Sequence, residues 1–568
     1  MRTRRTLVVL PLLLVGMGCG GTTDPNPNPG TLPTPSVACA AVALTQLGVG
    51  QHLVADPSNA SGCLRLPQAG ASGAQYLVVL ASTSGVRSSA GVSGPYLFRA
   101  SNPGTVVAAP SPASVSPDQD AATPRQSVAR EFDAMLRRRE RELLALPGAR
   151  ITPGTTAPMT APPVVGQEKS FKTCNNLTCS EFSTVTATAR YVGSHAAVYI
   201  DNTVPQSDPL NQADFDNLGT TFDTYHYPID TTAFGRESDI DGNGVVEILM
   251  TDAVNALTPD CTAGRVVGYF FGADLLNGPN SNRGEVFYTL VPAPSTPTCP
   301  AIPRESAVNN LKATLIHEFQ HMISFNQHAL VRGGNSEETW LNEALSHFAE
   351  ELGGRLIPNT QCPNPPFASC RSQYASRNIF NAYDYLKATE THFVVFPSVG
   401  SGTLAERGAV WLFLRWTLDQ FAADTILGTD MTRSLVQTQA TGAANLTAVT
   451  GGNLSTMIPQ WLMAAYLDDG TDLPVEPTGR LRYKSWGLRT IWTDPRNASS
   501  FPAGFPLGAD VIGGTYSRAG TLKAGSGRHF LVVQTAQGAA VDLQVLKNSA
   551  GNPLDPALAG RFGIVRIR

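Results

Sequence analysis

Two histidines four residues apart carry the most specific chemical signal in the sequence. His317 and His321 enclose Glu318 in a segment, 311–323, whose apolar residues recur at the spacing of a helix. Residues four apart lie on one face of a helix, so both imidazoles can bind one metal ion while Glu318 stands beside it. The alternative is a buried histidine pair with a structural role only. We expect a zinc site at His317 and His321, with Glu318 as the base that activates a zinc-bound water.

A hydrolytic zinc ion needs a third protein ligand and an open fourth position for water. Glu343 lies in the next helical pattern, at residues 337–351, and would complete a His, His, Glu set. It could instead be a surface carboxylate, because four other glutamates share this pattern: Glu337, Glu338, Glu350 and Glu351. His347, four residues after Glu343, faces the same way, so it either supports a ligand imidazole or packs in the core.

Two longer stretches resemble a known family. H-E-F-Q-H-M-I at 317–323 and W-L-N-E-A-L-S at 340–346 are similar to the gluzincin metallopeptidases, and in particular to the hyicolysin-type secreted bacterial peptidases. The resemblance runs from about Tyr191 to Leu467. It implies that His317, His321 and Glu343 bind zinc and that Glu318 is the catalytic base.

The sequence departs from this family at the group that would stabilise an oxyanion. Gluzincins supply a Tyr or His from the helical half, whereas here Glu406-Arg407-Gly408 stands where the Tyr is expected. A milder departure is Ala344, where such families often have Gly. Five residues remain as candidate donors: Tyr374, Tyr383, Tyr385, His392 and Arg407.

A second constellation predicts a site for a hard cation. Asp239, Asp241, Asn243 and Glu247 place oxygen donors along an Asp-rich turn, with Gly244 at its sixth position, like the start of a calcium loop. Met250 occupies the position that normally supplies a bidentate Glu. The turn is therefore either a differently completed calcium site or an Asx-rich hairpin turn.

The first residues have the features of an export signal. Three arginines among the first five residues precede an apolar run from Leu7 to Val15, which is too short to span a membrane. The sequence around Cys19 resembles the cleavage site of bacterial lipoproteins, with ordinary cleavage of a signal peptide at 1–18 as the alternative. Residues 19–36 form a predicted linker. We expect an exported protein, either secreted or lipid-anchored on a bacterial cell envelope through Cys19.

The cysteines support export. Apart from Cys19, eight remain, and an even number in an exported chain indicates disulfides. Eight cysteines allow 105 connectivities. We favour the pairs that are close in sequence: Cys39 with Cys63, Cys174 with Cys179, Cys261 with Cys299, and Cys362 with Cys370.

Composition divides the chain into several units. Residues 37–108 and 486–568 are rich in short alternating runs, which predicts a small all-β domain on each side of the catalytic domain. Similar octets at 72–79 and 526–533 suggest a repeat, with shared strand composition as the alternative. The segment 109–166 is Pro-rich and contains a charged helix, Arg125 to Leu146. We expect a solvated helix that covers its neighbour, with a membrane-surface role or an inhibitory pro-segment as alternatives.

The catalytic domain is expected at residues 167–485. Strand patterns at 195–200, 245–250, 266–271 and 285–291 precede the histidine helix, and helical patterns follow, notably at 405–421 and 454–467. The predicted fold class is α+β: a zincin-like domain with a twisted sheet, an active-site helix and a helical subdomain, flanked by small all-β domains. The cleft should lie where the two subdomains meet.

These observations favour a secreted or surface-tethered zinc endopeptidase that acts on protein or peptide substrates. A formal net charge of −4 argues against nucleic acid as a partner, and a membrane enters only through the anchor at Cys19. A zinc aminopeptidase is the first alternative, although the Gly-x-Met-Glu-Asn motif that would hold a free amine is missing. A catalytically inactive surface binding protein is the second. It is disfavoured because a decayed site has no need of Glu318.

Overall fold

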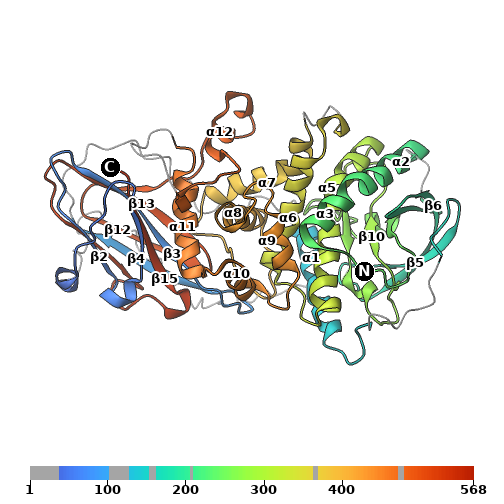
Figure 1. The fold of residues 1–568 in the computed structure, drawn as a ribbon, viewed down its shortest axis with the longest axis horizontal. Coiled ribbons are helices and arrows are strands. Elements are labelled where there is room, and N and C mark those ends of the chain that lie inside the picture. Colours follow the sequence, from blue (N-terminus) through green and yellow to red (C-terminus); the bar gives the residue numbers. More distant parts are fainter. Residues whose placement is uncertain (1–36, 102–126, 152–160, 205–208, 363–368, 471–478) are drawn as a thin grey trace, which may run out of the picture.

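The computed structural model describes residues 37–101, 127–151, 161–204, 209–362, 369–470 and 479–568. These residues form a mixed α+β structure in three parts: a six-stranded sheet with covering helices, a helical half and a β-sandwich (Figure 1). The predicted signal peptide, Cys19 and the linker at 19–36 lie outside the described residues. Among the helices that the structure describes, none is both long and apolar enough to cross a membrane.

The six-stranded sheet contains the four strands predicted before the histidine helix. Its order is β5 (Glu168–Cys174), β6 (Phe182–Val192), β7 (Ala196–Asp201), β8 (Val246–Met250), β10 (Val286–Thr289) and β9 (Gly268–Phe270). β7, β8 and β10 run parallel, whereas β9 pairs with β10 in the antiparallel direction and forms one edge. Every residue of β8 is buried, as expected of a strand that is covered on both faces.

Different helices cover the two faces of this sheet, because side chains alternate along each strand. Ala196 and Val198 join the core that includes α2 (Gln212–Thr221), α3 (Tyr227–Phe234) and α5 (Arg304–Phe325). Ala197 and Tyr199 point to the other face and share a core with α1 (Ser127–Leu144) and α4 (Asp252–Ala256). α5 therefore lies on one face of the sheet, whereas α1 packs on the other face and reaches the first core through Leu144.

α1 is the charged helix that the sequence predicts, but it is less solvated than expected. Arg138 and Arg139 are exposed, whereas Phe132, Leu136 and Arg137 are buried. In Figure 1, α1 lies at the junction between the six-stranded sheet and the helical half.

The helical half begins with α6 (Thr339–Leu356), which packs against α5, α7 (Cys370–Leu386) and α8 (Leu404–Phe421). It continues through α9 (Thr429–Val436), α10 (Gly442–Thr450), α11 (Leu454–Leu467) and α12 (Leu488–Thr493). The helices predicted at 337–351, 405–421 and 454–467 are confirmed as α6, α8 and α11. Gly408 fixes the approach of α8 to α7, because a Cβ at this position would come within 2.2 Å of the Asn381 backbone.

The two ends of the chain form one β-sandwich. One sheet has the order β1 (His52–Ala55), β15 (Gly560–Arg566), β3 (Ala74–Ser82), β13 (Gly527–Gln534) and β11 (Asp510–Ile512). The other has the order β12 (Tyr516–Lys523), β4 (Ser93–Ala100), β14 (Val541–Leu546) and β2 (Cys63–Leu66). The prediction of two separate β domains at 37–108 and 486–568 is therefore corrected. The local pattern specifies strands but not their partners, and here every N-terminal strand pairs with a C-terminal one.

The two similar octets lie side by side in this sandwich. β3 and β13 are antiparallel neighbours, with Val78 opposite Phe530. Tyr76, Val78 and Leu80 face the core between the two sheets, whereas Leu77 and Val79 face the core that includes α11. β3 is thus buried on both faces, which explains its continuous apolar run.

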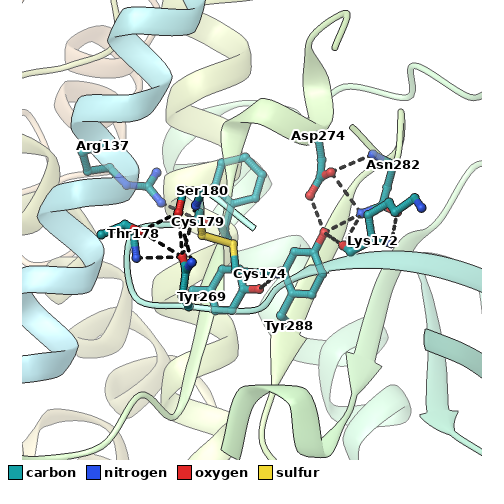
Figure 2. Close-up of a disulfide and its surroundings, with 12 residues drawn as sticks. Arg137, Lys172, Cys174, Thr178, Cys179, Ser180, Tyr269, Asp274, Asn282 and Tyr288 are labelled. Atoms are coloured by element: carbon teal, nitrogen blue, oxygen red, sulfur yellow. Dashed lines mark hydrogen bonds between the residues drawn. A yellow bond between two sulfur atoms is a disulfide. The ribbon is translucent and has the colours of Figure 1, made fainter. Parts of the chain in front are cut away.

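All four predicted disulfides are present: Cys39–Cys63, Cys174–Cys179, Cys261–Cys299 and Cys362–Cys370. Figure 2 shows Cys174–Cys179 beside Tyr269 of β9, whose hydroxyl accepts a hydrogen bond from the Cys174 N–H at 3.4 Å. The Tyr269 ring stacks on Tyr288 with centroids 4.5 Å apart. The hydrogen bond therefore joins β5 and β9, the first and last strands in the sheet order, with the disulfide and the aromatic pair beside it.

Candidate metal centre

Two adjacent helices bring the predicted ligands together. His317 and His321 lie one turn apart on α5, with ring centroids 4.8 Å apart, and Glu343 projects from α6. Glu343 Oε2 is 3.7 Å from His317 Nε2, and its Oε1 is 3.8 Å from His321 Nε2. All three side chains are buried.

This donor set fits a zinc ion. Zinc bonds to nitrogen and oxygen are about 2.0–2.2 Å long, so neighbouring ligand atoms of a tetrahedral site lie roughly 3.3 Å apart. The three donor atoms lie within 4.8 Å of one another, close to that requirement. The Glu343 side chain is fully buried, and its charged neighbour is Arg407, whose Nη1 lies 2.8 Å from Glu343 Oε2. A cation beside a buried carboxylate offsets the cost of burying its charge.

α6 also supplies residues that orient the imidazoles. Glu343, His347 and Glu350 follow one another at intervals of four and three residues, so they share the face that meets α5. Glu350 Oε1 lies 2.8 Å from His317 Nδ1 and 3.3 Å from His347 Nδ1. A carboxylate at Nδ1 directs Nε2 toward a metal. His347 lies beside Glu350 but neither of its ring nitrogens makes a hydrogen bond, so both roles that the sequence leaves open stay predictions.

The protonation states suit metal binding. Burial lowers the pKa of His317, and it lowers the pKa of His321 further, so both imidazoles are held in the neutral form that ligates metals. Burial alone would raise the pKa of Glu350, but His347 and His317 bring it down to about 2. Burial raises the pKa of Glu343, and Arg407 opposes that rise. A bound cation would favour the charged form of Glu343 in the same way.

Glu318 lies beside the predicted metal ligands, and its carboxylate is outside their group of close donor atoms. Its Oε2 accepts a hydrogen bond from the Phe270 N–H of β9 at 3.0 Å. Burial raises the pKa of Glu318 to about 8, the Asp133 carboxylate adds to the rise, and Arg137 opposes it. A carboxyl group with a pKa near neutrality can both accept and return a proton.

Arg407 is the candidate oxyanion donor that lies at this centre. Its Nη1 is 2.8 Å from Glu343 Oε2. The neighbouring Gly408 lets α8 approach α7 closely, and this approach fixes the position of Arg407. The other candidates contact residues outside this cluster: Tyr374 bonds to His226, the Tyr383 hydroxyl accepts from the Ala503 N–H, and Tyr385 packs against His392.

Two residues on α1 lie at the centre, although no motif marks them. Asp133 is 3.2 Å from Arg407 and 3.4 Å from Arg137, and these two guanidinium groups lower the pKa of Asp133 despite its burial. The sequence predicts a solvated charged helix and does not single out Arg137. The signal that could have found it is its spacing from Asp133 and Glu140, four residues before and three after, which lets a buried arginine be neutralised within one helix.

The carboxylates that lie together at the Asp-rich turn differ from the predicted calcium ligands. Asp239 and Asp241 lie together, and Glu285, which directly precedes β10, joins them with its donor atom within 4.8 Å. Glu247 instead pairs with Lys169 at 2.6 Å, and the Asn243 side-chain amide donates to Asp241 at 2.9 Å. The calcium ligand set thus stays a prediction, with Glu285 as an additional carboxylate.

Comparisons with known proteins point in the same direction. Over 191 residues, or 32% of this chain, the sequence is 31% identical to the neutral metalloprotease ShpI of Staphylococcus hyicus. The match covers 40% of that relative, so the chain spans less than half of its length. No family model matches the chain.

Among solved structures, an M1 zinc metallopeptidase variant from Deinococcus radiodurans, bound to a Tyr-Ser-Ala substrate, covers 55% of this chain and 54% of its own. The identity is 11% and the TM-score is 0.28, which is too low to support an argument from fold. The chain is therefore similar to a neutral metalloprotease across about a third of its sequence, and it carries a buried His, His, Glu cluster.

Proposed function

We propose that this protein is an exported zinc-dependent endopeptidase in which His317, His321 and Glu343 hold the metal. One arrangement carries the proposal: two imidazoles from α5 and a carboxylate from α6 converge, with Glu318 next to them. The similarity to a neutral metalloprotease supports it. A zinc ion at this place would polarise a peptide carbonyl and lower the pKa of a bound water to about 7.

The residues around the ligands have distinct tasks in this proposal. Glu318 takes up a proton and delivers it to the leaving amine. Its Oε2 is held by the Phe270 N–H, so Oε1 is the oxygen available for that proton. Arg407 supplies the positive charge that a developing oxyanion needs. Glu350 keeps the His317 ring in the orientation that presents Nε2.

The experiment that tests this function measures metal and hydrolysis together. Purified full-length protein should contain one zinc ion per chain and cleave casein, and a zinc chelator should abolish cleavage. His317→Ala should lose both zinc and activity, because two protein ligands cannot hold the ion tightly. A protein that cleaves casein equally well without zinc would contradict the proposal. No observation favours an aminopeptidase or an inactive binding protein over this function.

We also propose that the protein is exported and lipid-anchored through Cys19. Four disulfides are consistent with an oxidising environment outside the cytoplasm. Cys19→Ser should move the protein from the membrane fraction to the soluble fraction. An unchanged distribution would leave ordinary secretion as the explanation.

A further inference from the structure

α1 lies directly over the metal centre. Arg407 Nη1 contacts Glu343 at 2.8 Å, and Arg407 Nη2 contacts Asp133 of α1 at 3.2 Å. One guanidinium group therefore links a predicted zinc ligand to this helix. With α1 in place, His317 is 8% exposed, His321 1% and Glu343 0%, which leaves little room for a substrate.

α1 also occupies the free edge of the six-stranded sheet. Arg137 Nη2 donates a hydrogen bond to the Phe270 carbonyl of β9, and the Glu140 carboxylate accepts one from the Gly272 N–H at 2.6 Å. Figure 2 shows Arg137 extending from α1 toward this edge. The outward backbone groups of an edge strand are those that an extended peptide would pair with. Here side chains of α1, Arg137 and Glu140, bond to backbone groups at this edge instead.

The contact is apolar as well as polar. The Phe132 ring packs edge-to-face on Tyr269 of β9 with centroids 5.1 Å apart. Arg137 is only 3% exposed, and Asp133 and Glu140 neutralise it from the same helix. A buried arginine that carries its own counterions can leave the surface as a unit, because it leaves no unpaired charge on the sheet.

We propose that α1 is an autoinhibitory segment that fills the substrate cleft and must leave before a peptide can bind. The inference rests on the proposed peptidase function. Asp133 holds α1 over the metal centre through Arg407, and Arg137 holds it there through β9. We call this arrangement the covered state.

The β-sandwich limits how such an inhibitor could be removed. β1, β2, β3 and β4 precede α1, and each pairs with a C-terminal strand. Removing the whole N-terminal region would break both sheets of the sandwich. The covered state is therefore released by displacing α1, or by cuts on both sides of it, while residues 37–101 stay in place.

The test compares peptide binding and hydrolysis in full-length variants. In a Glu318→Gln background, Arg137→Ala and Asp133→Asn should each bind a fluorescent casein peptide at least about tenfold more tightly, and hydrogen exchange in residues 127–144 should speed up. In protein that keeps Glu318, the same two substitutions should increase the hydrolysis rate. Arg139→Ala is the matched control, because its side chain is 47% exposed on the far face of the helix. Arg139→Ala should change neither the peptide affinity nor the hydrolysis rate.

The outcomes separate the two proposals. If the unaltered chain binds and cleaves the peptide as well as both α1 variants, while exchange in α1 speeds up in the variants, the autoinhibitory role is wrong and the peptidase stands. If no form binds or cleaves peptide although exchange shows that α1 has been released, both proposals are wrong.

A different observation carries a second inference, at the Asp-rich turn. Glu285 is 1% exposed, and its Oε1 accepts hydrogen bonds from the Ser238 hydroxyl and the Ile240 N–H. Its Oε2 has no hydrogen-bond partner, although it is buried and lies within 4.8 Å of the donor atoms of Asp239 and Asp241. An ionised carboxylate in such a place needs a cation.

Among the described residues, one lysine forms ion pairs at this turn. Lys169 lies 2.6 Å from Glu247 and 3.8 Å from Asp241, so its positive charge mainly neutralises Glu247. Asp239 and Asp241 hold the turn by accepting backbone N–H bonds from Gly244 and Asn243 with one oxygen each. Carboxylate oxygens around a tight turn are the ligands that Ca²⁺ prefers.

We infer that Asp239, Asp241 and Glu285 form a calcium site that links this turn to β10, with Glu247 outside it. Ca²⁺ titrated into the full-length protein, at constant buffered free Zn²⁺, should bind in a saturable way and raise the melting temperature. Glu285→Gln and Asp239→Asn should each weaken this binding at least about tenfold. Glu247→Gln and Asp260→Asn, the latter at an exposed loop position, should leave it unchanged.

Absence of saturable Ca²⁺ binding up to millimolar concentration would overturn this site. Loss of binding in Glu247→Gln, with Glu285→Gln unaffected, would overturn the assignment of Glu285.

Discussion

His317 Nδ1 lies 2.8 Å from Glu350 Oε1, so a carboxylate on the neighbouring helix holds the first histidine of the motif. Glu350 is seven residues after Glu343, two turns along the same face of α6. One helix thus supplies both a predicted zinc ligand and the group that orients another. The packing of α5 on α6 is therefore part of the metal centre.

This contact predicts the effect of Glu350→Gln. Losing the charge at Nδ1 should weaken zinc binding by about 10-fold to 100-fold, the usual range for such supporting residues. Competition with a chromogenic zinc chelator measures the affinity. An affinity equal to that of the unaltered protein would mean that Glu350 contributes only to packing.

Replacing Glu343 should have a larger effect. Glu343→Gln keeps the size of the side chain but removes an anionic ligand, so zinc affinity and hydrolysis should both fall more than in Glu350→Gln. Glu338→Gln is the matched control, because Glu338 precedes α6 and accepts a hydrogen bond from the Trp340 indole. If Glu338→Gln is the variant that loses zinc, the ligand set has been assigned wrongly.

The elements of the fold were predictable, but their partners were not. The spacing of apolar residues predicts α5, α6 and β8, because each buries a face with a fixed period. The β-sandwich escaped prediction because β3 pairs with β13 across some 450 residues of sequence. Strand composition contains no information about so distant a neighbour.

The same distinction holds at the metal centre. His317, His321 and Glu318 form a short motif, so their geometry follows from one helix. Asp133 lies at this centre only because α1 packs across β9, and Glu285 meets Asp239 only because β10 runs beside the turn. Such contacts depend on tertiary packing, which a local pattern cannot specify.

Arg407 should matter for turnover more than for metal. Arg407→Gln removes the positive charge beside Glu343, so kcat should fall by about 100-fold to 1,000-fold while one zinc ion per chain is retained. The comparison is made in the Arg137→Ala background, where release of α1 does not limit the rate. An unchanged kcat would remove Arg407 from the reaction.

Asp230 should make stability depend on pH. It is fully buried on α3 with no hydrogen-bond partner for either oxygen, and burial raises its pKa well above the usual value. The folded state therefore keeps a proton that the unfolded state loses above about pH 4. The contribution of Asp230 to stability is full below that pH and is lost as pH rises toward the raised pKa.

Asp230→Asn should abolish this loss, so the variant should gain stability over the unaltered protein at pH 8 but not at pH 4. Urea unfolding at both pH values measures the difference, and Asp216→Asn at an exposed position is the control. The same difference in unfolding free energy at both pH values would contradict a raised pKa at Asp230.

The central claim is that Glu318 is the base of a zinc peptidase and not a ligand. Its Oε2 is bonded to the Phe270 N–H, whereas the imidazoles of His317 and His321 converge on Glu343. Glu318→Gln preserves size and the capacity to accept that hydrogen bond, but it cannot take up a proton.

The most direct test therefore measures zinc content and casein-peptide hydrolysis in Glu318→Gln beside the unaltered protein. We expect one zinc ion per chain in both and a rate about 100-fold to 10,000-fold lower in the variant, the scale of losing a positioned acid-base group. Equal rates with equal zinc would contradict the account.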